Sequence, residues 1–161
     1  MEIFLDSSDI KEIRGLNKAN LIDGVTTNPS LLASASTDFK ILLKEICHEI
    51  KGPVSAEVTA PDVPSMLKEA DVLRKIAKNI VIKVPLTWNG LQACNILSAK
   101  KIKVNVTLCF SASQALLAAK AGATYISPFI AIFLNTSAPY HILESTTVRN
   151  SYQRPSYHNE K

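Results

Sequence analysis

The chain has 161 residues, 47% of them hydrophobic, and a formal net charge of +4. This length allows one domain with a sizeable core, and the apolar fraction excludes an intrinsically disordered chain. Its basic residues are scattered without a run, which argues against a nucleic-acid partner. We also expect no secretory signal and no membrane partner, because the first residues include a short apolar run flanked by acids and no apolar run approaches a membrane span.

The three cysteines are odd in number and far apart, at Cys47, Cys94 and Cys109. No pair of them has CxxC spacing, so neither a disulfide framework nor a zinc site is indicated. We interpret them as buried thiols, which fits a cytoplasmic protein.

Six short β-rich runs are spaced along the chain, and a segment that can form a helix follows most of them. The runs lie at residues 2–6, 21–27, 54–58, 80–85, 103–108 and 124–129. Pro29 and Pro64 suit the first turns of the helices that follow them. Ser111 and Gln114 form a capping-box pattern, and Gly122 stands where that helix should end.

The alternation of strands and helices, with strands that are apolar on both faces, predicts a parallel sheet with right-handed crossovers. A doubly wound sheet and a (β/α)₈ barrel both fit the repeat length. No GxGxxG follows a strand, which weakens a dinucleotide-binding interpretation. A complete barrel takes about 250 residues, so we expect an α/β fold of the TIM-barrel type with about six βα units, lacking its last two strands.

The sequence changes character at residue 131. Residues 131–161 contain no Gly and no Asp, and they hold three of the four tyrosines. Neither a strand–helix pair nor an amphipathic period is visible there. We therefore predict a partial barrel over residues 1–130 and an atypical tail over residues 131–161 that does not belong to the barrel, with residues 140–161 disordered or poorly packed.

Lys83 stands inside the run "IVIKVP", which otherwise has the pattern of a buried strand. Polar residues also stand at the carboxyl ends of the other predicted strands, where parallel α/β folds bind ligands. They are Asp6, Thr26 to Asn28, Glu57, Asn105, Thr107 and Ser127. This coincidence at six strand ends predicts one common site.

Each residue also has a purely structural interpretation. Lys83 could extend along its stem to water, Asp6 could cap the helix that opens at "SSDIKEI", and Asn28 before Pro29 could be a helix N-cap. Glu57 is harder to explain in this way, because a buried glutamate requires a partner.

These residue types support one chemistry. Apolar surroundings disfavour the ammonium form of a lysine, and a free amine can attack a ketone to form a Schiff base. The protonated imine withdraws electrons, so that an adjacent C–C bond can break. A base must accept the hydroxyl proton, and Asp6 and Glu57 are the available carboxylates. The chemistry requires no metal and no cofactor.

Five segments resemble the transaldolase family, and above all its small transaldolases and fructose-6-phosphate aldolases. They are "LDSSD" at 5–9, "GVTTNPSLL" at 24–32, "AEV" at 56–58, "IVIKVPLTWNGLQA" at 80–93 and "VNVTLCFSASQALLAAKAGATYISPF" at 104–129. The resemblance covers residues 1–130. It implies a (β/α)₈ barrel, sugar-phosphate substrates, transfer of a dihydroxyacetone unit in the pentose phosphate pathway, and a homo-oligomer.

The resemblance also implies catalytic roles. Lys83 would form the Schiff base, Asp6 would act as acid and base on the cleaved hydroxyl, and Glu57 and Thr107 would hold the water used in imine formation and hydrolysis.

The remaining site residues would bind substrate. Asn28 and Asn105 would bind substrate hydroxyls with support from Thr26, Ser127 would contact the far end of the substrate, and Phe129 would line the site. Glu57 and Phe129 stand where fructose-6-phosphate aldolases tend to carry glutamine and tyrosine, which favours a transaldolase.

The chain departs from the family after Phe129. Ile132 replaces the arginine that binds the sugar phosphate in the family, and the last two strands are missing. Two alternatives to a transaldolase therefore stay open, an inactive truncated fragment and a fructose-6-phosphate aldolase.

Overall fold

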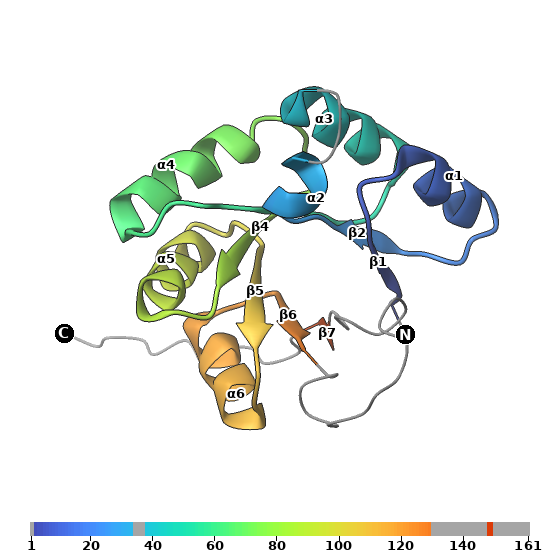
Figure 1. The fold of residues 1–161 in the computed structure, drawn as a ribbon. Helices are drawn as coiled ribbons and strands as arrows, with labels where there is room; N and C mark the ends of the chain where they lie inside the picture. Colours follow the sequence, from blue (N-terminus) through green and yellow to red (C-terminus); the bar gives the residue numbers. More distant parts are fainter. Residues whose placement is uncertain (1, 34–37, 130–147, 150–161) are drawn as a thin grey trace.

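The computed structural model describes residues 2–33, 38–129 and 148–149. One sheet contains the strands of these ranges in chain order, from β1 to β7, and the first six are parallel. They are β1 (Phe4–Asp6), β2 (Gly24–Thr26), β3 (Val54–Glu57), β4 (Ile80–Pro85), β5 (Val104–Cys109) and β6 (Tyr125–Pro128). The sheet curls into part of a (β/α)₈ barrel, which confirms the predicted fold class (Figure 1).

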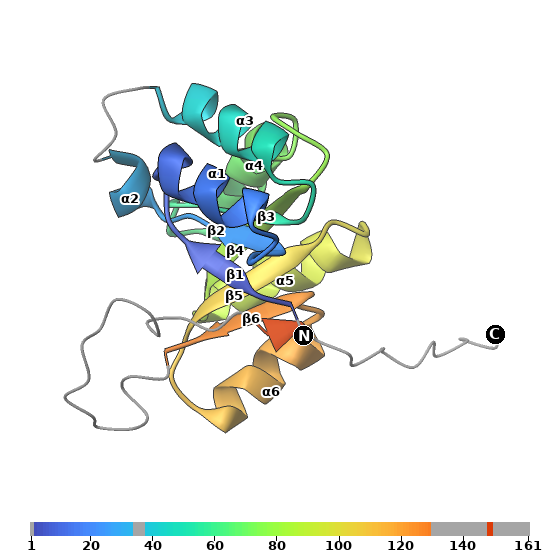
Figure 2. The ribbon, with the colours of Figure 1, turned by 90° about the vertical axis from the view of Figure 1, so that its right-hand side faces the viewer.

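Helices alternate with the strands and cover the outer, convex side of the curled sheet (Figures 1 and 2). They are α1 (Ile10–Lys18), α2 (Pro29–Ala33), α3 (Phe39–Glu49), α4 (Val63–Leu73), α5 (Trp88–Ala99) and α6 (Ala112–Ala121). Pro29 opens α2, and Pro64 lies in the first turn of α4, as predicted. Ser111 caps α6 by accepting the N–H of Gln114, and Gly122 ends it in the left-handed region at φ 100°, where glycine is the preferred residue.

The hydrophobic core lies between the convex face of the sheet and the helices. Strand residues that point outward are fully buried there, among them Val25, Val54, Ile82 and Val106, each with 0% exposure. Alternation along each strand therefore sends every second side chain into this apolar layer.

The concave face of the sheet is polar toward the carboxyl ends of the strands and apolar deeper in the barrel, where Phe4, Val81 and Tyr125 lie, so the prediction of strands that are apolar on both faces holds only in part. Strand register places Asp6 beside Thr26, Glu57 beside Lys83, and Lys83 beside Asn105. Register partners in a parallel sheet point to the same face. This face lines the barrel interior, where polar side chains bind one another instead of packing on helices.

The curl of the sheet brings its first and sixth strands together. The rings of Phe4 in β1 and Tyr125 in β6 meet edge to face, with centroids 5.3 Å apart, although four strands separate them in the sheet order. Gly24 permits this arrangement, because a Cβ there would overlap the Phe4 ring. Tyr125 is 1% exposed, so the barrel interior is packed at this level.

β7 (Val148–Arg149) pairs with β6 in the antiparallel direction, opposite Tyr125 and Ile126. It is therefore not a further parallel strand of the barrel. The other residues of 140–161, for which disorder or poor packing is predicted, lie outside the described residues. The predicted boundary between a partial barrel over 1–130 and a tail over 131–161 stays a prediction.

All three cysteines are buried thiols, as predicted. Burial raises the pKa of the Cys47 thiol to about 12, so this thiol stays protonated and unreactive. Within the described ranges, no helix is both long and apolar enough to span a membrane.

Asn79 joins the end of α3 to the start of β4. Its Nδ2 lies within hydrogen-bonding distance of three carbonyl oxygens, at 3.2 Å from Cys47, 2.8 Å from Ile50 and 2.9 Å from Gly52. We expect Asn79→Ala to lower the free energy of unfolding by about 1–3 kcal/mol, because buried carbonyls lose their donor. Urea denaturation measures this change.

The matched control for Asn79 is Asn95→Ala, which removes an exposed amide from α5. A surface change of this kind should alter the free energy of unfolding by no more than about 0.5 kcal/mol. Equal losses in the two variants would contradict the role given to Asn79.

Candidate active site

The amine of Lys83 lies inside the barrel mouth and has two polar partners. The residue is 6% exposed, so the interpretation of a side chain that extends to water is wrong. Its Nζ lies 3.2 Å from Oε2 of Glu57 and donates to the carbonyl oxygen of Thr27 at 3.1 Å. The sequence suggested apolar surroundings for this amine. The structure instead places a carboxylate and a carbonyl oxygen beside it.

Asp6 does not cap the first helix. Asp9 has that role and accepts the N–H of Lys11, whereas Oδ1 of Asp6 accepts the hydroxyl proton of Thr26 at 2.7 Å. The hydroxyl of Thr26 fixes the orientation of an otherwise exposed carboxylate. The structure thus excludes the capping role and places Asp6 at the cavity described below.

Asn28 caps α2 and also lies at the cavity, so the cap is confirmed and the ligand contact stays a prediction. Its Oδ1 accepts the N–H of Leu31 at 2.9 Å, which is the bond expected of a helix N-cap. The same residue lines the cavity at the barrel mouth.

A cavity of about 380 Å³ opens at the carboxyl ends of the strands. Six of the nine predicted site residues line it, together with Pro29, Ser30 and Leu108. The six are Asp6, Asn28, Glu57, Lys83, Thr107 and Phe129. The cavity therefore combines one amine, two carboxylates, an amide and two hydroxyl groups with apolar side chains.

The other three predicted residues, Thr26, Asn105 and Ser127, are buried beside this cavity and do not line it. Asn105 is 0% exposed; its Nδ2 donates to Oγ of Ser55 at 3.1 Å, and its Oδ1 accepts from Oγ of Ser127 at 3.0 Å. We call these three residues, together with Ser55, the floor of the site, because they are buried beneath the cavity.

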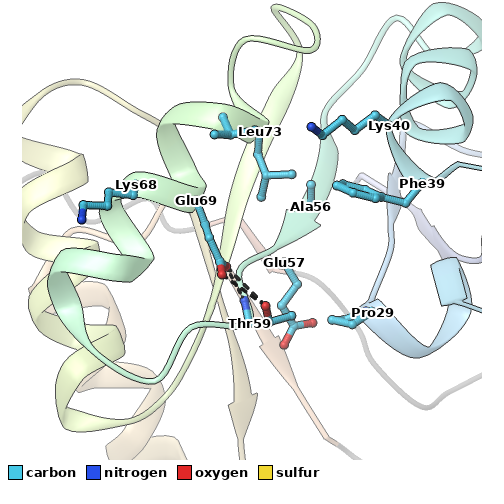
Figure 3. Close-up of a pocket in the computed structure, with 10 residues that line it drawn as sticks. Pro29, Phe39, Lys40, Ala56, Glu57, Thr59, Lys68, Glu69 and Leu73 are labelled. Carbon is cyan, nitrogen blue, oxygen red and sulfur yellow. Dashed lines mark hydrogen bonds between the residues drawn. The ribbon is translucent and has the colours of Figure 1, made fainter.

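A second hollow of about 590 Å³ lies on the other side of Glu57, between α3 and α4 (Figure 3). Glu57 and Pro29 line both spaces, but Lys83, Asp6 and Thr107 line only the smaller one. In Figure 3 the Glu69 carboxylate binds Thr59 at the edge of this hollow. Of these two spaces, the smaller one combines Lys83 with both predicted carboxylates, Asp6 and Glu57.

Four residues at the site were not predicted as site residues from the sequence: Pro29, Ser30, Ser55 and Leu108. Ser55 contacts Asn105 and stands two positions before Glu57, a spacing that places both on one face of a strand and could have revealed it. Leu108 lines the cavity beside Thr107. Regular strand alternation forbids this arrangement, so no sequence pattern indicated Leu108.

A profile of the family described as "Transaldolase/Fructose-6-phosphate aldolase" matches residues 3–152. The chain belongs to this family. The match extends past residue 130, where the resemblance was expected to end.

Curated relatives agree with this assignment to the transaldolase family. A "Probable transaldolase" of Parvibaculum lavamentivorans and one of Brucella anthropi are each 61% identical to the chain over 130 residues, and one of Paracoccus denitrificans is 58% identical. Each alignment covers 81% of this chain and 60% of the relative. The chain thus aligns with about three fifths of the length of these relatives.

The pair of Lys83 and Glu57 should show strong energetic coupling. Lys83→Met leaves a carboxylate without its cation, and Glu57→Gln leaves a buried ammonium without its anion. We expect each change to destabilise the protein and the double variant to lose less than the sum, with a coupling energy of about 1–3 kcal/mol in urea denaturation.

The matched control combines Glu57→Gln with Lys103→Met, an exposed lysine at the opposite end of β5. These two changes should be additive within about 0.5 kcal/mol. Equal coupling in both cycles would contradict the assigned pair.

Proposed function

We propose that this chain is a transaldolase that transfers a dihydroxyacetone unit between sugar phosphates through a Schiff base on Lys83. One observation carries the proposal: a buried amine lies in a cavity with two carboxylates and a hydroxyl. Family membership and the names of the relatives support the reaction class.

Formation of the imine would begin at the ion pair. Nζ of Lys83 and Oε2 of Glu57 are 3.2 Å apart. A proton can therefore pass directly from the ammonium group to the carboxylate, which leaves a free amine inside the cavity. The amine attacks the ketose carbonyl carbon, and the resulting carbinolamine loses water to give the imine. Glu57 and Thr107, which both line the cavity, would hold that water and exchange its protons.

Cleavage of the C–C bond would depend on Asp6. Its carboxylate accepts the proton of the substrate hydroxyl while the bonding electrons move into the protonated imine, which releases an aldose and leaves an enamine. The hydrogen bond from Thr26 occupies Oδ1 of Asp6 and fixes the group, so Oδ2 can accept the proton. Attack of the enamine on a second aldose returns this proton and forms the new bond.

The substrate, pathway and assembly belong to the same proposal. We propose sugar-phosphate substrates, a place in the pentose phosphate pathway, a cytoplasmic location and a homo-oligomeric state. Asn28 would bind a substrate hydroxyl, and Asn105, Thr26 and Ser127 would act from the floor of the site. Ile132, at the position of the family's phosphate-binding arginine, lies outside the described residues.

Borohydride trapping tests the proposal. Incubation with fructose 6-phosphate and borohydride should reduce the imine and leave a three-carbon adduct on Lys83, located by peptide mass spectrometry. Lys83→Met should abolish the adduct, whereas Lys103→Met, which removes an exposed lysine, should retain it.

Two results would contradict a transaldolase. A folded protein without an adduct would favour the inactive fragment. Release of free dihydroxyacetone at the same rate with and without an acceptor aldose would favour a fructose-6-phosphate aldolase.

A further inference from the structure

Strand β5 contains one extra residue beside the cavity. Val106 pairs with Ile126 and Cys109 pairs with Pro128, so two residues of β5 stand opposite one residue of β6. This is a β-bulge. Within it Leu108 has φ 59°. This value lies in the left-handed region, which a leucine rarely adopts.

Hydrogen bonds on both sides hold the bulge in place. The carbonyl of Thr107 accepts the N–H of Leu86 at 2.8 Å, and the carbonyl of Cys109 accepts the N–H of Phe129 at 2.9 Å. Thr107 is thus bound to the residue that follows β4, and Cys109 is bound to the residue that follows β6. Both bonds stabilise the backbone that flanks Leu108.

The bulge changes which side chains face the cavity. Alternation would place Leu108 on the face opposite Thr107, yet both residues line the cavity. Phe129 lines it as well, and the Phe129 ring lies against Phe110 with centroids 5.3 Å apart. The backbone N–H of Phe110 donates to Oε1 of Gln114 at 2.7 Å, which holds the main chain of Phe110 at the start of α6. Leu108 and Phe129 form what we call the apolar rim of the cavity.

The apolar rim lies outward of the reacting amine. Thr107 pairs with Pro85, two residues beyond Lys83 toward the open end of the barrel, and Leu108 follows Thr107. Under the proposed function, the aldose part of a ketose joined to Nζ through its carbonyl carbon would extend toward the open end of the barrel, along the apolar rim. The same space receives the acceptor aldehyde.

We propose that Leu108 is a specificity-determining residue that favours transfer to an aldehyde over loss of the enamine to water; this inference rests on the proposed function. The enamine carbon has two fates. It can attack the aldehyde carbon, forming a C–C bond while the aldehyde oxygen takes a proton. Alternatively it takes a proton from water or an acid, and hydrolysis of the resulting imine then releases dihydroxyacetone and restores the amine. An apolar side chain at the rim keeps water away from the enamine and disfavours the second fate.

Three variants test this role. Leu108→Asn places a polar side chain at the rim and suits the left-handed region. Leu108→Gly removes the side chain and also relieves the backbone conformation. Leu117→Asn makes the same chemical change on α6, where the side chain is 54% exposed, and is the matched control. Each protein is assayed with fructose 6-phosphate and an aldose phosphate acceptor.

The readout is the ratio of free dihydroxyacetone to transfer product, measured beside the borohydride-trapped adduct on Lys83. We expect this ratio to rise roughly tenfold in Leu108→Asn and in Leu108→Gly, and to stay at the parent value in Leu117→Asn. The melting temperature of Leu108→Gly should be no lower than that of the parent protein. A changed product ratio in this variant then reflects the missing side chain and not a loss of folded protein.

The outcomes distinguish the two proposals. An adduct on Lys83 with an unchanged ratio in the two Leu108 variants would overturn the role of Leu108 and leave the proposed function intact. Absence of the adduct from the parent protein would overturn the proposed function, and the role of Leu108 with it. If Leu108→Asn does not fold, the ratio in Leu108→Gly decides.

Discussion

The ion pair between Lys83 and Glu57 is the constraint on which the concave face depends. The Lys83 residue is only 6% exposed. An ammonium group in such a place is stable only if an anion and further hydrogen bonds compensate for the water it has lost. The carboxylate at 3.2 Å and the Thr27 carbonyl supply both. The same rule extends across the face, since no buried side-chain nitrogen or oxygen among the described residues lacks a partner.

This pair in turn depends on the apolar residues behind it. Glu57 and Lys83 are direct register partners, and a slip of one residue would turn Lys83 toward the helices. Ile82 and Val84 prevent such a slip, because both are fully buried in the outer core and would lose their packing. Hydrophobic packing on the convex face therefore positions the chemistry on the concave face.

The sequence predicted those features that depend on local patterns. The helix signals at Pro29, Ser111 and Gly122 act over a few residues, and the structure confirms each of them. The strands were also found, since β4 carries a nearly continuous apolar run. The polar lining was predicted at the strand ends but not deeper in the barrel, where Ser55 shares the strand face of Glu57 but shows its role only through its cross-strand partner Asn105. The bulge at Leu108 is flanked by hydrogen bonds from Leu86 and Phe129, which follow β4 and β6, and no local pattern contains such long-range bonds.

The hydrogen bonds already made within the site determine which atoms can act on a ligand. Asn28 uses its Oδ1 to cap α2, so its Nδ2 is the group that can donate to a substrate hydroxyl. Asn105 uses both ends of its amide within the floor, and a contact with substrate would require it to exchange a bond with Ser55 or Ser127. The net free energy of such an exchange is close to zero, because one buried hydrogen bond replaces another. The hydrogen bonds of Asn105 with Ser55 and Ser127 therefore hold β3, β5 and β6 together around the amine.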